Sequence, residues 1–489
     1  MLDMTSLQDL QKVRIEKLEK LKAAGRNPFT ARTKRDTSVA QALAQFDELA
    51  ASQKPITLAG RVMIIRGQGA ILFVEIFDGT GKTQLVLKKD EMPEADFALF
   101  VDTIDMGDFI EATGPMFTTQ RGAKSLLIKS WNILTKAISP LPDKWAGLVD
   151  DDERYRKRYL DILMNPELHD LIEKYSKFWR SARQYMLDQG FLEITTPTLE
   201  TTTGGAEARP FATHHNDFDI PVYLRISVGE LWQKRALAAG FEKVFEIGRV
   251  YRNEGSSPNH LQEYTSMEFY AAYMDYVQGR TFIEKMVQYV AQETFGTLQF
   301  NIMGNTVDLS GTWPVIEYVP YVLEKTGVDV LKATEDEMKA KLTELGVSYD
   351  GETRERLTDT LWKYCRKSIV GPMWLTKHPK LVSPLAKSCE DNPLVTERLQ
   401  PILAGTECGN SFSELNDPID QRARFEEQQK LIDRGDDEAM MPDFEFVEML
   451  EHGMPPAFGS SPVGDRLFSV LAGKPIRETV LFPLMKPKK

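Results

Sequence analysis

The chain has 489 residues, 42% of them hydrophobic and 10% aromatic, so it is long and apolar enough for two or three globular domains. A formal net charge of −12 excludes a protein that is basic throughout, although a local basic patch could still bind nucleic acid. Three cysteines without a close pair exclude a disulfide framework and a thiolate metal site. With no signal-peptide pattern and no stretch of roughly 18 apolar residues, we expect a cytoplasmic protein that does not enter the membrane.

Residues 1–55 are expected to form a helical N-terminal extension. Apolar residues recur there at intervals of three to five, and lysines and arginines lie between them. This pattern fits either a solvated amphipathic helix or an RNA-binding face, and the residues alone leave both open. The apolar positions are Leu7, Leu10, Val13, Leu18 and Leu21.

Residues 56–145 replace the helical pattern with short β-rich segments that are separated by glycine-containing turns. The segments 56–62 and 71–77 are rich in β-branched residues, the turn 78–81 follows, and 83–87 is expected to pair back. Short strands at this spacing predict a small closed β-barrel, of which the OB-fold is the commonest.

Residues 146–489 predict a larger α+β domain, which follows a hinge of prolines and acidic residues. Within it, residues 320–370 combine helical periodicity with high charge and are interpreted as a helical insertion. Helices are expected at about 167–188 and 418–434, and strands at about 222–226, 244–251, 264–273, 373–376 and 398–417.

Residues that can neutralise phosphate gather around the hairpin 245–270. The first strand ends at Arg252, and the second carries Tyr264, Glu268 and Tyr270, which share one face because alternate strand residues point the same way. An arginine at a strand end can neutralise an α-phosphate and a carboxylate together, as acyl-adenylate formation requires. A surface hairpin of solvated ion pairs explains the same residues taken singly, so both interpretations stay open.

The same stretch closely resembles motif 2 of the class II aminoacyl-tRNA synthetases. Residues 154–161 resemble the lead-in of the lysyl-tRNA synthetases, and 190–197 resemble motif 1, the dimer-forming element. The segments 204–211 and 409–417 are similar to lysine-pocket segments of that family. The resemblance runs from about residue 10 to the C-terminus. It implies an OB-fold anticodon-binding domain before a catalytic domain built on an antiparallel sheet flanked by helices.

The resemblance also implies a reaction. A homodimeric enzyme would activate L-lysine with ATP and Mg²⁺ to lysyl-adenylate, release pyrophosphate, and transfer lysine to the 3′ end of tRNA(Lys). By this resemblance Arg252 contacts the α-phosphate and the lysine carboxylate, and Arg466 reaches the γ-phosphate. The other ATP contacts that it implies are Glu254, His260, Tyr264, whose ring stacks on adenine, and Glu407.

A lysine side chain ends in an ammonium, which needs a carboxylate and hydrogen-bond acceptors when it is buried. The resemblance assigns Glu414 and Tyr270 to this group. The related aspartyl and asparaginyl enzymes need a cationic or amide-matching floor instead, and Glu414 argues against them. The remaining lysine contacts that the resemblance implies are Gly205, Glu230 and Glu268 for the α-amino group, Asn410 with Arg252 for the carboxylate, and Phe412.

The segment 455–466 is similar to motif 3 but departs from it. Gly459 and Arg466 are present, whereas Ser461, Pro462 and Val463 stand where alternating glycines are expected. Glycine lets the backbone approach a ligand closely, so the departure concerns the adenosine side of the site.

Two further departures concern the metal and a loop. Glu407 matches one Mg²⁺ ligand of the family, but Gln400 stands where a second acidic ligand is usual. The segment 225–230 is one residue longer than usual.

In the predicted barrel the resemblance assigns the anticodon to Phe73, which would stack on a base, and to Arg66 and Gln84, which would supply polar contacts. A barrel-core role for Phe73 is equally compatible with the sequence. Ser130 replaces the glutamate that is usual at the end of this barrel.

Two other functions stay open. A lysyl-adenylate ligase that modifies a protein would lack the N-terminal barrel that this sequence predicts. An inactive paralogue is supported by the altered motif 3 alone, and the retained charged cluster argues against it.

Overall fold

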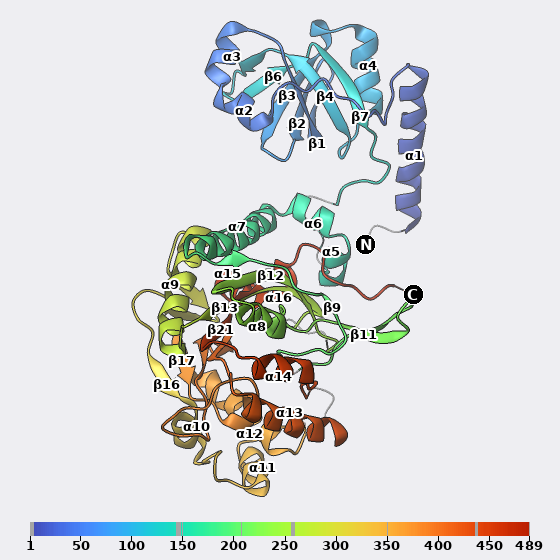
Figure 1. Cartoon of the computed structure of the whole chain (residues 1–489). Helices are drawn as coiled ribbons and strands as arrows, with labels where there is room; N and C mark the ends of the chain where they lie inside the picture. The colour runs from blue at the N-terminus through green and yellow to red at the C-terminus, as the bar shows by residue number, and fades with distance from the viewer. Residues whose placement is uncertain are drawn as a thin grey trace. The chain divides into compact units, whose positions relative to one another are not determined.

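This computed structural model describes residues 4–142, 148, 150–206, 208–255, 260–349, 351–435 and 439–488. The chain divides into two compact units, residues 1–151 and 152–489, whose elements are labelled in Figure 1. None of the described helices has the length and apolar content that a membrane crossing requires.

The first unit is the expected OB-type barrel. Its strands follow the order β5-β6-β3-β2-β1-β4-β7. Burial alternates along β2, where Leu72, Val74 and Ile76 point into the core and their neighbours point outward. The bounds are β1 (Ile56–Gln68), β2 (Ile71–Phe77), β3 (Lys82–Lys88), β4 (Phe109–Gly114), β5 (Met116–Thr118), β6 (Lys124–Leu127) and β7 (Ser130–Thr135).

Four helices accompany this barrel, and three of them precede it in the chain. They are α1 (Met4–Ala23), α2 (Val39–Ala44), α3 (Phe46–Ser52) and α4 (Glu94–Thr103). Leu21, Val39 and Phe46 belong to the same hydrophobic core as the barrel strands. The N-terminal helices are therefore packed parts of the barrel unit, and α4 is an element that the sequence pattern did not reveal.

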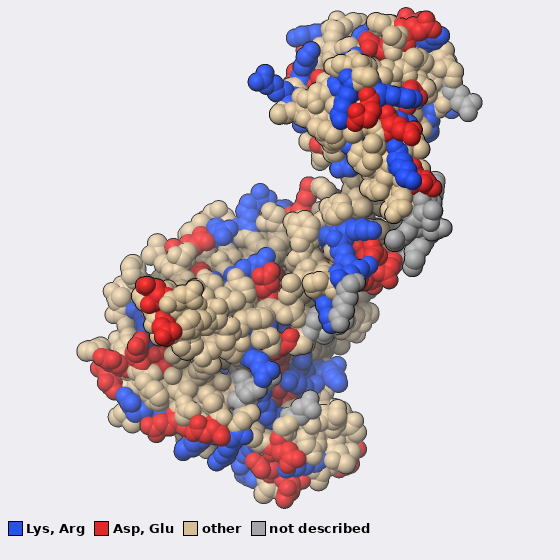
Figure 2. Space-filling model, turned by 90° about the vertical axis from the view of Figure 1, so that its right-hand side faces the viewer, with Lys and Arg blue, Asp and Glu red and all other residues tan. Residues whose placement is uncertain are grey.

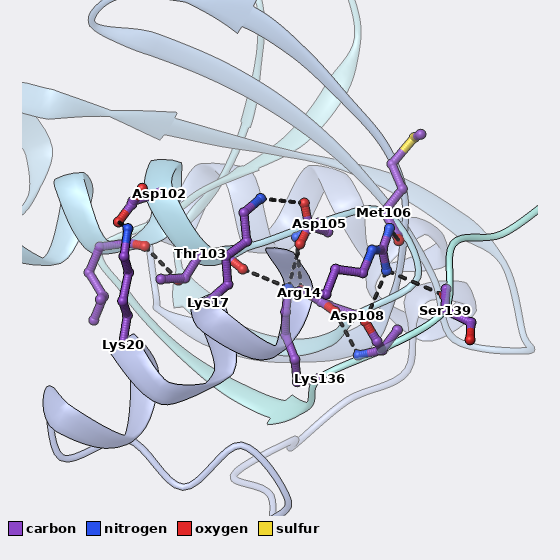
Figure 3. A network of polar contacts seen from close by, with 12 residues as sticks. Arg14, Lys17, Lys20, Asp102, Thr103, Asp105, Met106, Asp108, Lys136 and Ser139 are labelled. Carbon is purple, nitrogen blue, oxygen red and sulfur yellow. Dashed lines mark hydrogen bonds and ion pairs between the residues drawn. The ribbon is translucent and has the colours of Figure 1, made fainter. Parts of the chain in front are cut away.

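The basic residues of α1 contact acidic groups of the barrel (Figure 3). Lys17 Nζ lies 2.6 Å from Asp105 Oδ1, and the fully buried Lys136 Nζ lies 2.6 Å from Asp105 Oδ2 and 2.8 Å from Asp108 Oδ2. Burial acts to raise the pKa of Asp105, but Lys136 and Lys17 outweigh it, and the pKa is lowered. Arg14 donates to the backbone carbonyl oxygens of residues 106 and 137. These contacts favour a packing role for this face of α1 over an RNA-binding one.

We predict that Lys136→Met lowers the free energy of unfolding of the barrel unit by about 3–5 kcal/mol, because the buried Asp108 loses its counter-charge and the partly buried Asp105 keeps only Lys17. Chemical denaturation of the full chain measures the loss. The matched control is Lys20→Met, since the pair of Lys20 with Asp102 is 56% exposed on both sides. That variant should lose less than about 1 kcal/mol, and equal losses would contradict the prediction.

The second unit is built on a nine-stranded sheet. Its path is β16-β17-β18-β20-β21-β13-β12-β8, with β19 paired to β18. The central pairs are antiparallel, and parallel pairing occurs between β8 and β12 and between β16 and β17. The bounds are β8 (Leu192–Glu193), β12 (Lys243–Tyr251), β13 (Glu263–Ala272), β16 (Val315–Glu317), β17 (Met373–Thr376), β18 (Arg398–Leu403), β19 (Thr406–Glu407), β20 (Asn410–Ser413) and β21 (Ala457–Gly464).

One face of this sheet is covered by helices α7 (Pro166–Asp188), α9 (Tyr276–Phe295) and α15 (Asp465–Ala472) (Figure 1). Met267 and Phe269 of β13 lie in the hydrophobic core beneath these helices. Since side chains alternate along a strand, the residues between them, among them Glu268, point to the opposite face. The polar residues of β13 are thereby separated from its apolar ones.

The opposite face carries α8 (Glu230–Ala238), α13 (Pro418–Asp433) and α14 (Phe444–Glu451), which share a second core with β13 and β20. The segment expected to be a helical insertion contains α10 (Tyr318–Thr326), α11 (Glu335–Glu344) and α12 (Arg354–Cys365). These three helices form their own core, which reaches the sheet through Leu375 and Ile402. The other elements are α5 (Asp151–Arg156), α6 (Arg158–Met164), α16 (Ile476–Thr479), β9 (Leu199–Glu200), β10 (Ala212–His215), β11 (Ile220–Leu224), β14 (Gln299–Ile302) and β15 (Asn305–Asp308).

The acidic net charge is not spread as a uniform surface. On the face shown in Figure 2, acidic and basic side chains are interspersed over both units. Local electrostatics, and not the total charge, therefore govern what each surface can bind.

Candidate active site

A cavity of about 590 Å³ lies on the polar face of β13 in the second unit. The walls come from β13, β18, β20, β21, the start of α8, and α12 of the insertion. Most of the residues that the sequence singled out line it together. They are Gly205, Glu230, Arg252, Glu254, His260, Tyr264, Glu268, Tyr270, Gln400, Glu407, Asn410, Phe412 and Arg466.

Arg252 enters the cavity directly after β12. Its backbone N–H donates to the carbonyl oxygen of Gln262 at 2.8 Å, which closes the hairpin between β12 and β13. Its guanidinium lies 5.6 Å from the ring centre of Tyr264. The Nε of Arg252 is buried and has no hydrogen-bond partner among the described residues. An arginine held in this way can donate to a phosphate or a carboxylate that enters the cavity.

Three carboxyl groups are buried together at one end of the site, those of Glu230, Glu268 and Glu414. Glu268 accepts hydrogen bonds from the backbone N–H of Val228 at 2.7 Å and from the Tyr270 hydroxyl at 3.1 Å. Val228 lies in the lengthened loop before α8, so that loop supplies a contact to the cluster. Burial, with the neighbouring Glu230, raises the pKa of Glu268 to about 7.

Glu414 lies behind the cavity wall and is not one of its lining residues. Its side chain is completely buried, Oε2 forms an ion pair with Lys234, and Oε1 has no hydrogen-bond donor among the described residues. Burial raises the pKa of Glu414 to about 8, although Lys234 acts against the rise. A buried acceptor without a donor is a suitable partner for a cationic ligand group.

Lys234 is a member of this cluster that the sequence analysis did not identify. It lies one helical turn after Glu230 on α8, and its Nζ is 2.8 Å from Glu230 Oε1 and 2.5 Å from Glu414 Oε2. The i, i+4 spacing of an acidic and a basic residue was visible in the sequence, but it usually marks a solvated helix face.

Two glycines allow this close packing. A Cβ at Gly459 would lie 2.0 Å from Glu414 Oε1 and 2.3 Å from the Tyr270 ring. Gly205 has a φ of +86°, and a Cβ there would lie 2.7 Å from Glu230 Cβ. Side chains at these positions would displace the carboxylates.

The departure from alternating glycines in β21 has a structural explanation. Met267 pairs with Val463 and Phe269 pairs with Ser460, so Ser461 and Pro462 both lie opposite the single residue Glu268. This is a β-bulge, a place where a strand tolerates proline because no ladder hydrogen bond is required of it. The serines are paired as well, since the Ser461 and Ser266 hydroxyl oxygens are 2.9 Å apart.

Glu407 lies on the wall formed by β19, and its Oε1 accepts a hydrogen bond from Trp362 Nε1 of α12 at 2.6 Å. The Oε1 of Gln400 lies 3.0 Å from Nε2 of His378. Burial first, and then Arg398, lowers the pKa of His378 to about 3, so this imidazole is neutral. A carboxylate oxygen suits Mg²⁺, and Glu407 therefore fits a magnesium ligand, whereas the Gln400 amide is engaged by His378.

Glu254, His260 and Arg466 also line the cavity. Burial and the positive charge of Arg466 lower the pKa of His260, which keeps the imidazole neutral at physiological pH. Next to Arg466, the buried Asp465 accepts hydrogen bonds from the Tyr175 hydroxyl at 2.7 Å and from the Thr265 backbone N–H at 2.8 Å. These bonds fix the start of α15 and thus the place from which Arg466 extends.

Arg398 is a second site residue that the sequence analysis missed. It lines the cavity from β18, and its Nε donates to Asn410 Oδ1 at 2.8 Å. The bond orients the Asn410 amide so that its nitrogen remains available as a donor. From the insertion, Glu355, Asp359 and Lys363 of α12 also line the cavity.

The residues assigned to the anticodon lie on the outer surface of the barrel in the first unit. Arg66 and Phe73 are directly opposite each other on β1 and β2. Phe73 is partly exposed and does not belong to the barrel core, so the alternative of a core role is wrong. Gln84 of β3 donates from Nε2 to Ser125 Oγ at 2.9 Å.

Comparisons with known proteins agree with this architecture. Residues 150–486 match the family of class II tRNA synthetases for D, K and N, and residues 56–134 match the OB-fold nucleic acid binding domain. The chain belongs to the class II tRNA synthetases. Within this class it belongs to the lysine–tRNA ligase family, because relatives with that name match along nearly the whole of both chains.

Three of these relatives show the extent of the match. The lysine–tRNA ligase of Roseiflexus sp. is 39% identical over 487 residues, which cover 99% of each chain. That of Thermotoga maritima is 38% identical over 488 residues, which cover 99% of this chain and 97% of the relative. That of Moorella thermoacetica is 41% identical over 485 residues, which cover 98% of each.

We predict that Gly459→Ala destabilises the second unit by about 1–3 kcal/mol, because its Cβ would overlap Glu414 and Tyr270. The control is Gly464→Ala on the same strand, where a Cβ would meet nothing closer than 3.5 Å. Denaturant unfolding of both variants makes the comparison. A loss at Gly459→Ala no larger than at Gly464→Ala would show that the carboxylate cluster can move aside.

Proposed function

We propose that this chain is a cytoplasmic lysine–tRNA ligase, which uses ATP to activate L-lysine and transfers the lysyl group to the 3′ end of tRNA(Lys). The observation that carries the proposal is that the two ends of one cavity carry side chains of opposite charge. Arg252 and Arg466 supply positive charge for phosphates at one end, and the buried carboxyl groups of Glu230, Glu268 and Glu414 supply negative charge at the other. A lysine and an ATP need this combination.

In the first step the lysine carboxylate attacks the α-phosphorus of ATP, the bond to the β-phosphate oxygen breaks, and pyrophosphate leaves. Arg252 neutralises charge that builds up on the α-phosphate and holds the lysine carboxylate, together with Asn410. Arg466 contacts the γ-phosphate, and Glu254 and His260 contact the nucleotide, whose adenine stacks on Tyr264. Positioning and charge neutralisation carry the catalysis, since no covalent enzyme intermediate is formed.

At the lysine end, Glu414 and Tyr270 receive the ε-ammonium over Phe412. Gly205, Glu230 and Glu268 receive the α-amino group. In support, Oε1 of Glu414 is buried without a hydrogen-bond donor among the described residues, and Gly459, which lines the cavity, has no side chain to fill the space beside it. A buried carboxylate of this kind rejects a neutral side chain because the charge would remain uncompensated.

Mg²⁺ would be held by Glu407, and when bound it would screen the negative charge of the triphosphate. Glu407 offers its second oxygen, since Oε1 is used by Trp362. Gln400 is a weaker ligand than a carboxylate because its amide is neutral and because its oxygen already contacts His378.

In the second step the terminal hydroxyl of tRNA attacks the carbonyl carbon of lysyl-adenylate, and AMP leaves. We assign anticodon binding to Arg66, Phe73 and Gln84 of the barrel. The partly exposed Phe73 supports base stacking, since an aromatic ring on an OB-fold surface can stack on any unpaired base.

We also propose a homodimer that is formed through the segment 190–197 and the residues next to it. In support, Leu192 of this segment and the flanking Leu187 and Leu199 are 48%, 45% and 52% exposed. Light scattering should give twice the mass of one chain, and Leu199→Glu should shift the mass toward one chain. A single-chain mass at all concentrations would refute the dimer.

The test of the proposed function is amino-acid-dependent pyrophosphate exchange with all twenty amino acids, followed by tRNA charging. Exchange with lysine alone, followed by charging, is the expected result. Exchange without charging would indicate a different acceptor, such as a protein lysine. No exchange with any amino acid would indicate an inactive paralogue.

We predict that Glu414→Gln lowers kcat/KM for lysine in the exchange reaction at least about thirtyfold, while the protein stays folded, because the ammonium loses a buried counter-charge. The control is Glu263→Gln, an exposed glutamate on β13, which should be active at the wild-type level. Near wild-type activity of Glu414→Gln would remove the argument for lysine specificity.

A further inference from the structure

Among the described residues, two carboxylates and three aromatic rings surround the ammonium group of Lys234. Besides its two carboxylate partners, its Nζ lies 5.8 Å from the ring centre of Tyr270, 5.3 Å from that of Phe412 and 5.7 Å from that of Phe446. Its side chain is 1% exposed, so the charge is sealed from water. A lysine is almost never fully buried unless its charge is paired, and here two carboxylates and three aromatic rings surround it.

The positive and negative charges of this cluster are unequal in number. Glu230, Glu268 and Glu414 bring three carboxylates, and Lys234 brings one ammonium, so full ionisation leaves a surplus of two negative charges. An amino acid with a basic side chain carries two ammonium groups and neutralises this surplus. An amino acid with a neutral side chain brings one ammonium and leaves a buried negative charge unpaired, at a high free-energy cost.

We propose that Lys234 is a specificity-determining residue, a resident counter-charge that favours the ionised form of Glu414 over the protonated one, so that the pocket accepts an amino acid with two ammonium groups. This rests on the proposed function. Lys234 acts through the two carboxylates and is therefore a positioning residue, separate from the groups that contact the reacting atoms.

The charge balance links lysine binding to proton release. Burial raises the pKa of Glu268 to about 7 and that of Glu414 to about 8, so both carboxyl groups hold protons in the free site below those values. Bound ammonium groups require the ionised forms. Lysine KM should therefore be high at pH 6 and fall as the pH rises through 7 and 8. The groups that act on Glu414 are Lys234 and Glu230 of α8 and Glu268 of β13. Those that act on Glu268 are Glu230, the Val228 N–H, the Tyr270 hydroxyl and Arg225.

The decisive experiment compares lysine KM from pH 6 to 9 in wild type and Lys234→Met by pyrophosphate exchange. Without the ammonium, the pKa of Glu414 rises further. The pH at the midpoint of the KM profile should therefore rise by at least one pH unit. This corresponds to about a tenfold higher KM at pH 7. Discrimination between lysine and norleucine, which lacks the ε-ammonium, should fall about tenfold as well. The titration of free lysine is common to both profiles.

Lys136→Met is the matched control, because Lys136 is also a buried lysine between two carboxylates but lies in the other unit. Lys136→Met should destabilise the protein. It should leave the midpoint of the KM profile and the discrimination between lysine and norleucine unchanged. If Lys234→Met behaves in the same way, Lys234 is a structural ion pair and the proposal is wrong.

A second variant keeps the test decisive if Lys234→Met does not fold. Lys234→Gln removes the positive charge but keeps a hydrogen-bond donor beside the two carboxylates. A midpoint of the KM profile at least one pH unit above that of wild type supports the counter-charge role, and a midpoint within half a pH unit of wild type overturns it. If wild type shows no lysine-dependent exchange, the proposed function itself fails. Normal wild-type exchange with an unshifted Lys234→Met profile refutes only the role of Lys234.

Discussion

Three carboxyl groups share a buried end of the catalytic unit, and the geometry around them follows from the free-energy cost of placing like charges away from water. Glu268 is stabilised by the Val228 N–H and the Tyr270 hydroxyl, and Glu230 and Glu414 are bridged by the ammonium of Lys234. The loop before α8, the start of that helix and the end of β20 must therefore meet at one point. Each of these elements contributes one member or one hydrogen bond, so their relative positions are fixed together.

Strand β13 joins this charged end to the hydrophobic core. Met267 and Phe269 pack beneath α7 and α9, and the residues that alternate with them face the cavity. The strand can serve both purposes because its side chains point to opposite faces with a period of two. The bulge in β21 lies opposite Glu268 and lets the neighbouring strand bend without breaking this alternation.

The resemblance between the sequence and the class II synthetases predicted two arginines of the cavity, Arg252 and Arg466, the aromatic residues Tyr264, Tyr270 and Phe412, and the carboxylates of Glu230, Glu254, Glu268 and Glu407. It predicted them because these side chains stand in short contiguous segments whose spacing is visible. It did not reveal that Glu414 lies behind the wall, that Arg398 orients Asn410, or that Pro462 occupies a bulge. Those facts depend on pairings between strands that are far apart in the chain, and a linear pattern does not contain them.

By itself the sequence determined the two architectures, the order of most strands and helices, and the family to which the chain belongs, because periodicity and motif spacing are local properties. Tertiary structure alone decided the roles of residues whose partners are distant in the chain. Phe73 is on the outer surface of the barrel because its strand neighbours Leu72 and Val74 fill the core. Lys234 is an ordinary helix lysine in the sequence. It becomes part of a charge cluster only when folding brings Glu414, 180 positions away in the numbering, within 2.5 Å of its ammonium. Burial then converts a weak ion pair into a strong constraint, since the low polarity of the interior removes the screening by water.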